Sequence, residues 1–494
     1  MKLINRKIIG RLVIKYLNSF SNLFSTKQLM SENYNQLPTQ ILKKFNKSRF
    51  LGPQKLLCYA PLKMMYFAFN GEVIACCHNR KHIMGRYPEE SLDNIWNGKE
   101  YNLLRDFIAH DDLSHGCEVC KHALLAKNFD GAKNSLYDRY QVRSYPQIME
   151  FELDNRCNLA CVICSDLFSS TISIDQSEKG ITPIYDDEFV RQLETYIPHL
   201  KEVKFYGGEP FLINIYYTIW EKMLALNPNI QIVIQTNGTV LNERIMKLLE
   251  RGNFNINISI DSLEKENFEK IRKNASFEEV MSNVAYFEQY CKTKGTNLGI
   301  IPTPNRLNWQ DLPKLTNWAS KIGAKIYFNT LVTPLDLALW NLTSDELEEI
   351  ITTLYVAEID LQHRLANENA HHFADFISQL KSWQSNNNQF GSNDSKIKIS
   401  LEELQILRSL FLKNLSNSLD ISVRTELLNF FQHAFSEFDN STSQELFFAI
   451  IQKIPIDVVV EELSKKDSLQ LKKIIGKKIY EAGNEYQIIE TKQH

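Results

Sequence analysis

Residues 146–335 alternate short apolar runs with longer amphipathic segments, and this alternation limits the possible folds more than any other feature of the chain. The runs have the length of buried strands and lie at 147–153, 203–206, 230–236, 256–260, 298–303 and 325–332. Helical patterns fill the intervals, at 187–198, 214–226, 242–251, 276–292 and 310–321. Such alternation predicts a parallel sheet with right-handed crossovers. Six strands are too few for a closed eight-stranded barrel, which leaves a partial barrel or an open doubly wound sheet.

The whole chain has 494 residues, so we expect further domains on both sides of a core at 146–340. Five other segments differ from the core in composition. They are a basic amphipathic segment at 1–50, a separate cysteine-containing unit at 51–145, a helical extension at 341–382, a polar linker at 383–396 and a helical C-terminal domain at 397–494. The C-terminal domain carries no motif that indicates its role, and nothing in the sequence fixes an oligomeric state.

The first 50 residues carry ten Lys or Arg residues against one acid, with apolar residues at helical spacing. This pattern fits a helix that touches a membrane surface or one that packs on its own protein, and we expect the second. No apolar run there is long enough to cross a bilayer, and no export signal is recognisable. Eight of the nine cysteines lie before residue 165, which favours metal binding in a reducing cytoplasm over disulfides. The net charge of −3 does not indicate a nucleic-acid partner.

Three cysteines, Cys157, Cys161 and Cys164, directly follow the first predicted strand. Sites in parallel α/β folds are built at this end of the sheet. Thiolates suit zinc or an iron–sulfur cluster. Zinc would need a fourth ligand, and no Cys or His occurs between 165 and 198. The spacing instead fits three corners of a [4Fe–4S] cluster whose fourth iron is open to a substrate or cofactor.

Four motifs, in this order, give residues 146–335 a specific resemblance to the radical S-adenosylmethionine (SAM) superfamily. CNLACVIC (157–164) matches the family's Cys-x3-Cys-x2-Cys motif, with Ile163 where many members have an aromatic residue. GGEP (207–210), QTNG (235–238) and SIDS (259–262) follow the second, third and fourth strands, where similar proteins contact SAM. The resemblance implies a partial (β/α)6 TIM-type barrel and a [4Fe–4S] cluster with SAM at its open iron. The SAM-binding residues that it implies are Gly207, Gly208, Glu209, Pro210, Thr236, Asn237, Ser259, Asp261 and Asn308.

Elementary chemistry agrees with part of this assignment. Gly207 and Gly208 would let the backbone approach a ligand closely, and Glu209 could bind an ammonium group. The plainer alternative is a strand-to-helix turn with Pro210 in the first helical turn. Asp261 could equally be the N-cap of the next helix. In the chemistry that the resemblance implies, the reduced cluster cleaves SAM to a 5′-deoxyadenosyl radical, which takes hydrogen from the substrate. No catalytic residue beyond the cluster ligands is assigned.

A second set of cysteines lies upstream of the core. Cys58, Cys76 or Cys77, Cys117 and Cys120 supply four thiolates. GEVIAC (71–76) resembles the Gly-x4-Cys step of SPASM/twitch domains, which hold auxiliary clusters and usually follow the barrel, and its spacing favours Cys76 over Cys77. The resemblance implies a second [4Fe–4S] cluster. A structural zinc ribbon is the alternative, and its possible further ligands are His78, His82, His115 and His122.

We therefore expect an enzyme with radical SAM chemistry. Family analogy favours a peptide or protein substrate that is oxidised, cross-linked or epimerised. A small molecule such as a sugar is the alternative, and a metal-stabilised binding or scaffold protein is the alternative without turnover. An external one-electron donor of the flavodoxin or ferredoxin type would reduce the cluster.

Overall fold

The computed structural model describes residues 35–390, apart from 126, 130, 166–167, 175–183 and 333, together with 397–400 and 486–489. Most of the basic segment predicted at 1–50 and the helices predicted within 401–485 lie outside these residues. The chain divides into two compact units. One comprises Met1–Ala338 with Ala357–Ala374, and the other comprises Leu339–Val356 with Asp375–His494.

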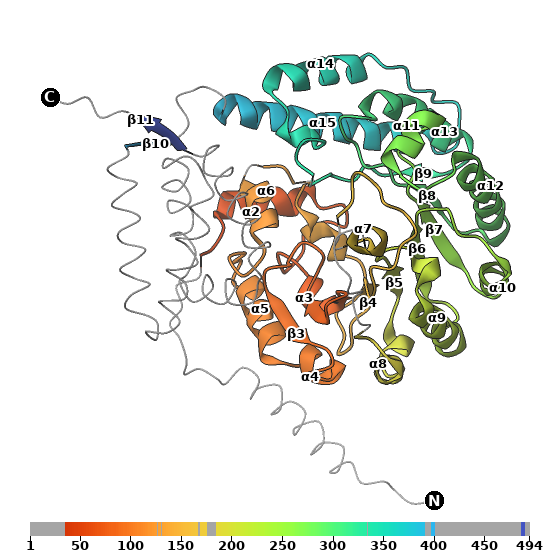
Figure 1. Cartoon of the computed structure of the whole chain (residues 1–494). Helices are drawn as coiled ribbons and strands as arrows, with labels where there is room; N and C mark the ends of the chain where they lie inside the picture. Colours follow the sequence, from red (N-terminus) through yellow and green to blue (C-terminus); the bar gives the residue numbers. More distant parts are fainter. Residues whose placement is uncertain are drawn as a thin grey trace, which may run out of the picture. The chain divides into compact units, whose positions relative to one another are not determined.

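The first unit is built on one nine-stranded sheet, in the order β3-β2-β1-β4-β5-β6-β7-β8-β9. Its second part is β4 (Ile148–Phe151), β5 (Glu202–Phe205), β6 (Gln231–Thr236), β7 (Phe254–Ile258), β8 (Leu298–Ile300) and β9 (Lys325–Ile326). These six strands pair in parallel, each with the next along the chain. They are the six strands that the apolar runs predict, and the partial barrel of six strand–helix units is confirmed (Figure 1).

Helices lie between the parallel strands along the chain. They are α7 (Ser170–Ile174), α8 (Asp187–Leu193), α9 (Asn214–Leu226), α10 (Glu243–Arg251), α11 (Lys265–Ile271), α12 (Phe277–Lys294) and α13 (Leu312–Lys321). Local signals set their ends. The Asn242 side chain accepts a hydrogen bond from Ile245 N at the start of α10, and Gly295 takes the left-handed conformation that ends α12. Under α9, the ring of Phe205 contacts Trp220 at a centroid distance of 5.3 Å.

The N-terminal cysteine-containing region is joined to this sheet. Its strands are β1 (Met64–Phe67), β2 (Glu72–Ile74) and β3 (Ile83–Arg86), and β1 pairs in parallel with β4. Around them lie α2 (Thr39–Ser48), α3 (Ala60–Lys63), α4 (Leu92–Trp96), α5 (Lys99–Ala109) and α6 (Glu118–Leu125). The region predicted as a separate unit at 51–145 thus shares one sheet with the core. β1 pairs with β2 on one side and β4 on the other, and all four of its residues are buried.

The structure also differs from the sequence-based expectation in the second unit and at its border. The helices are α14 (Ser344–Tyr355) and α15 (Ala366–Phe390), so residues 383–390, predicted as linker, continue α15. β10 (Ile397–Ser400) and β11 (Tyr486–Ile489) pair in parallel, so the C-terminal domain is not all-helical. Both strands are rich in isoleucine, which favours the extended backbone. Within the described residues, no helix combines the length and the apolar character that a membrane crossing requires.

Candidate functional site: two cysteine sets beside a polar sheet face

The loop that carries Cys157, Cys161 and Cys164 begins after β4 and is held on one side by the turn after β5. Gly208 N donates a hydrogen bond to Asp154 O at 3.1 Å, and Glu209 N donates to Arg156 O at 2.7 Å. A Cβ atom on Gly207 or Gly208 would come closer than 3.0 Å to these backbone carbonyls. The two glycines therefore permit the turn to pack against the cysteine loop. Their contact with a ligand stays a prediction.

The other side of the cysteine loop is held by the last residue of α11 and the residues directly after it. Val162 N donates to Ile271 O at 2.9 Å, and Ala160 N donates to Lys273 O at 3.1 Å. The three cysteines are partly exposed. Burial raises the pKa of Cys161 to about 12, and the positive charge of Arg272 opposes that rise. Three soft sulfur donors on one short loop suit an iron–sulfur cluster.

Glu209 lies at the centre of the contacts between these loops and is fully buried. Its carboxylate accepts hydrogen bonds from Thr236 Oγ1 at 2.8 Å, Asn237 N at 2.7 Å and Phe211 N at 3.1 Å. Burial raises the pKa of Glu209 to about 7, although these donors oppose the rise. The carboxylate has about four acceptor positions, so one remains for a further donor. The turn with Pro210 at its first helical position is also present, as the plainer alternative predicts.

Asn237 links the turn after β6 to the first cysteine. Its Nδ2 donates to Asn158 Oδ1 at 3.0 Å and lies 3.8 Å from Cys157 Sγ, within hydrogen-bonding range for sulfur. Thr236 is buried and donates to Glu209. The GGEP and QTNG motifs thus lie directly beside the CNLACVIC loop, as their order along the sheet predicts.

The residues after β7 and β8 make a second set of contacts. Asp261 is fully buried, with Oδ1 accepting from Thr303 N at 2.7 Å and Oδ2 lying 2.8 Å from Arg272 Nη2. Asn308 is also buried and donates to Asp261 O at 3.1 Å. Both side chains therefore hold the loop after β8. The N-cap alternative for Asp261 is wrong, because α11 begins after Glu264. Ser259 is partly exposed, and its backbone N donates to Thr236 O at 3.0 Å.

Arg272 is a site residue that the sequence analysis missed. It is buried, and burial alone would lower its pKa, but Asp261 and Cys161 raise it. A guanidinium is therefore charged beside the cysteine loop. Arg272 is one of two adjacent basic residues in IRKN (271–274), which gives no signal of burial, so only the fold identifies it.

The face of the parallel sheet opposite the helices is polar, and the sequence analysis missed this too. The register places Glu150 between Tyr66 and Lys204, while the alternate residues Phe151 and Phe205 are fully buried. We call six residues on or next to this face the polar cluster: Tyr66, Arg80, Glu150, Glu152, Lys204 and Tyr206. The signal was available, because charged residues alternate with apolar ones in EFEL and VKFY.

Ion pairs order the polar cluster. Lys204 Nζ donates to Glu150 Oε1 at 3.0 Å, and Arg80 Nη2 donates to Glu152 Oε2 at 2.9 Å. Tyr66 also donates to Glu152. Burial alone would lower the pKa of Lys204, but the neighbouring carboxylates raise it. The Lys204 side chain keeps 27% of its surface exposed and that of Arg80 keeps 44%, so both remain accessible to a ligand.

The second cysteine set lines one pocket. Cys58, Cys76, Cys117 and Cys120 lie in its wall together with Asn79 and Tyr137. Cys77 is not among the lining residues. Burial, and to a smaller extent the negative charge of Glu150, raises the pKa of Cys77 to about 12. Burial also raises the pKa of Cys58 to about 12. Four thiols around one pocket have the number and softness that a fully ligated cluster requires.

Comparison with protein families gives two matches. Residues 152–319 match the model of the radical SAM superfamily, and residues 58–121 match the SPASM model, an iron–sulfur cluster-binding domain. The second match covers the cysteine-containing region ahead of the core.

Several curated proteins are similar over part of this chain. The GTP 3′,8-cyclase of Streptomyces coelicolor is 28% identical over 188 residues, which are 36% of this chain and 51% of that protein. The GTP 3′,8-cyclase of Paenarthrobacter nicotinovorans is 26% identical over 242 residues, 47% of this chain and 65% of that protein. Molybdenum cofactor biosynthesis protein 1 of Drosophila melanogaster is 30% identical over 137 residues, 28% of this chain and 23% of that protein. The chain thus spans less than two thirds of each relative.

Among solved structures, Streptococcus suis SuiB bound to S-adenosylmethionine matches with a TM-score of 0.33 and 14% identity, over 52% of this chain and 56% of that one. The protein anSMEcpe with bound AdoMet matches with a TM-score of 0.34 and 20% identity, over 42% of this chain and 59% of that one.

Proposed function

Because the chain belongs to the radical SAM superfamily and carries a SPASM iron–sulfur domain ahead of its core, we propose that it is a radical SAM enzyme acting on a polar small molecule. Cys157, Cys161 and Cys164 would hold the cluster that takes SAM. When bound, the cluster and SAM supply a carbon-centred radical able to remove hydrogen from an unreactive C–H bond. Reduction would come from an external one-electron donor of the flavodoxin or ferredoxin type.

The chain's own residues have distinct roles in this proposal. Glu209 keeps one acceptor position for the ammonium group of SAM while Thr236 and Asn237 fix its carboxylate. Asn237 directs an amide N–H at Cys157, which stabilises the sulfur as a thiolate ligand. Asp261 and Asn308 support the site by holding the loop after β8. Ser259, partly exposed at the end of β7, is left to contact SAM directly.

The proposed substrate class rests mainly on the polar cluster. It begins on β4, the strand that leads directly into the cysteine loop, so a molecule bound there would lie next to that loop. Its carboxylates, Glu150 and Glu152, and its cations, Arg80 and Lys204, balance in charge. Balanced donors and acceptors suit a neutral, hydroxyl-rich group such as a sugar or the sugar of a nucleoside. The similarity to GTP 3′,8-cyclases supports the same class and favours it over a peptide.

The proposal is tested by the compounds that stimulate SAM cleavage. Nucleosides and nucleotides including GTP, free sugars and sugar nucleotides are compared with short peptides, and 5′-deoxyadenosine is measured. Lys204→Met is expected to lower kcat/KM for the stimulating compound about 10- to 100-fold, because a charged hydrogen bond is lost. The matched control is Lys222→Met, which removes the exposed ion pair between Lys222 on α9 and Glu194. Stimulation by a peptide alone would contradict the small-molecule proposal.

The adjacent cysteines of the second set allow a matched comparison. We propose that Cys58, Cys76, Cys117 and Cys120 hold a second [4Fe–4S] cluster, since all four line one pocket. Cys76→Ala should therefore lose about four irons per chain, whereas Cys77→Ala should keep them. Iron analysis of the two variants, purified without oxygen, decides between the neighbours. Loss of iron in Cys77→Ala with retention in Cys76→Ala would reverse the assignment.

A further inference from the structure

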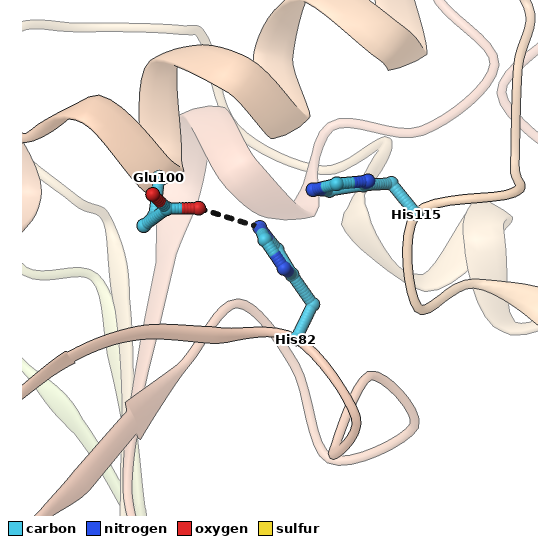
Figure 2. Close-up of side chains that lie close together, drawn as sticks. All are labelled: His82, Glu100 and His115. Atoms are coloured by element: carbon cyan, nitrogen blue, oxygen red, sulfur yellow. Dashed lines mark ion pairs between the residues drawn. The ribbon is translucent and has the colours of Figure 1, made fainter. Parts of the chain in front are cut away.

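Two histidines and a glutamate from three separate segments converge near the second cysteine set. His82 immediately precedes β3, Glu100 is in the first turn of α5, and His115 lies two residues before Cys117. Figure 2 shows the two imidazole rings and the carboxylate directed toward one another. One ligand atom from each residue lies within 4.8 Å of the other two.

The spacing of these atoms is close to that of a metal shell. His82 Nε2 lies 3.3 Å from Glu100 Oε2. A tetrahedral zinc ion with bonds of about 2.0–2.1 Å to nitrogen and oxygen holds its ligand atoms roughly 3.3 Å apart, so this pair already has the required spacing. The two imidazole rings, whose centroids are 3.8 Å apart, would rotate away from each other to bring both nitrogens to the ion.

The two histidines also lack the hydrogen bonds expected of buried groups. The Nε2 atoms of His82 and His115 are both buried, and neither makes a hydrogen bond among the described residues, although His82 Nε2 contacts Glu100 Oε2 at 3.3 Å. Buried polar atoms in folded proteins normally make hydrogen bonds, so two such nitrogens beside one carboxylate fit a site for a metal ion. Phe107 stacks on His115 at a centroid distance of 4.6 Å and fixes its ring from the other side.

One side of the cluster is open. The side chain of Glu100 is 37% exposed and that of His82 is 18% exposed. An ion could enter from solvent and keep a water molecule as its fourth ligand, as zinc does in sites with three protein ligands.

The cluster is distinct from the cysteine pocket but is connected to it. Neither histidine lines that pocket. Asn79 bridges the two, since its Nδ2 donates to His115 O at 3.1 Å and to Cys117 Sγ at 3.4 Å. Its Oδ1 accepts from His82 N at 3.3 Å. An ion held by the histidines would therefore also fix the loop that presents Cys117.

We propose that His82, Glu100 and His115 bind one divalent transition-metal ion, for which zinc is best suited, at a site separate from both cysteine sets. Two imidazoles and one carboxylate form a ligand set that zinc commonly takes. The ion would join the start of β3, the start of α5 and the loop before Cys117, three segments that no covalent link connects.

The test uses the full-length chain with its iron–sulfur clusters assembled without oxygen. Zinc is added, the excess is removed, and zinc and iron are counted per chain. We expect about one zinc, with X-ray absorption showing nitrogen or oxygen at about 2.0–2.1 Å and no sulfur at about 2.3 Å. His82→Ala and Glu100→Gln should weaken zinc binding at least 10- to 100-fold, since loss of even an outer-shell partner does so. His110→Ala, which removes an exposed histidine paired with Asp106 near the end of α5, should not.

Three results would overturn the site. They are the absence of saturable zinc binding in the wild-type chain, sulfur scattering around the bound zinc, or equal zinc affinity in wild type and both variants. Iron content is followed in each variant to show that the cysteine pocket is intact. If His82→Ala loses iron, zinc binding by Glu100→Gln is the deciding measurement, because the Glu100 side chain is partly exposed and does not line the cysteine pocket.

Discussion

Replacing Cys161 by alanine is expected to abolish formation of 5′-deoxyadenosine and to remove about four of about eight irons per chain. The reason is that two cysteines cannot take the place of three on the loop after β4, while the second cysteine set lines a pocket of its own. Hydrogen bonds from Val162 and Ala160 hold the loop independently of the sulfur, so the protein should remain folded. Iron content, absorbance near 400 nm and product analysis check the result.

The control for this variant is Cys291→Ala. Cys291 is buried on α12, and the described structure places it outside both cysteine sets. It should keep all irons and full SAM cleavage, with a small loss of stability from the missing sulfur. If Cys161→Ala still formed 5′-deoxyadenosine, the assignment of the first cysteine set as the SAM site would be contradicted.

The second large effect is expected from Asp261→Ala, which should lower the free energy of unfolding by about 3–5 kcal/mol. The change leaves Arg272 charged and buried without its carboxylate partner, and it removes the acceptor for Thr303 N. Arg272 lies between Ile271 and Lys273, whose carbonyl groups accept hydrogen bonds from the cysteine loop. We therefore expect the cysteine loop to loosen and iron to be lost faster. Urea titration and the rate of iron loss measure the two effects.

A double variant and a surface variant separate the causes. Asp261→Leu combined with Arg272→Met removes both charges and should recover a large part of the stability lost in Asp261→Ala. Lys314→Ala breaks the exposed ion pair with Glu264 and should cost less than about 1 kcal/mol. A loss in Asp261→Ala no greater than that of Lys314→Ala would show that the buried pair does not stabilise the site.

Periodicity predicted the six parallel strands because each contains a short apolar run that lies between amphipathic helical segments. The run 256–260 became β7 at Phe254–Ile258, an error of two residues at the start, and 325–332 shortened to β9 at Lys325–Ile326. β1 could not be predicted as part of the same sheet, because its register against β4 depends on a tertiary contact with no local signal. Strand–helix alternation therefore identified the core but not its extension.

The contacts between the motifs were predictable where motif residues follow strands, whereas contacts that depend on the path of the loops were not. Glu209, Thr236, Asn237 and Cys157 lie together, as their positions at strand ends imply. Gly207 and Gly208 pack closely against the backbone of residues 154–156, a contact that the sequence does not reveal, and their predicted contact with SAM stays a prediction. The roles of Asp261 and Asn308 depend equally on the loop after β8. Whether such a side chain contacts a ligand or a neighbouring residue depends on the tertiary fold, and the spacing of residues in the sequence does not reveal it.

The central claim is that the open position of the first cluster serves SAM. The most direct measurement is 5′-deoxyadenosine formed by the full-length chain, assembled with iron and sulfide without oxygen, reduced with dithionite and given SAM. We predict 5′-deoxyadenosine and methionine in equal amounts from a protein with about eight irons. A protein with about eight irons that forms no 5′-deoxyadenosine, alone or with any compound tested, would contradict the claim.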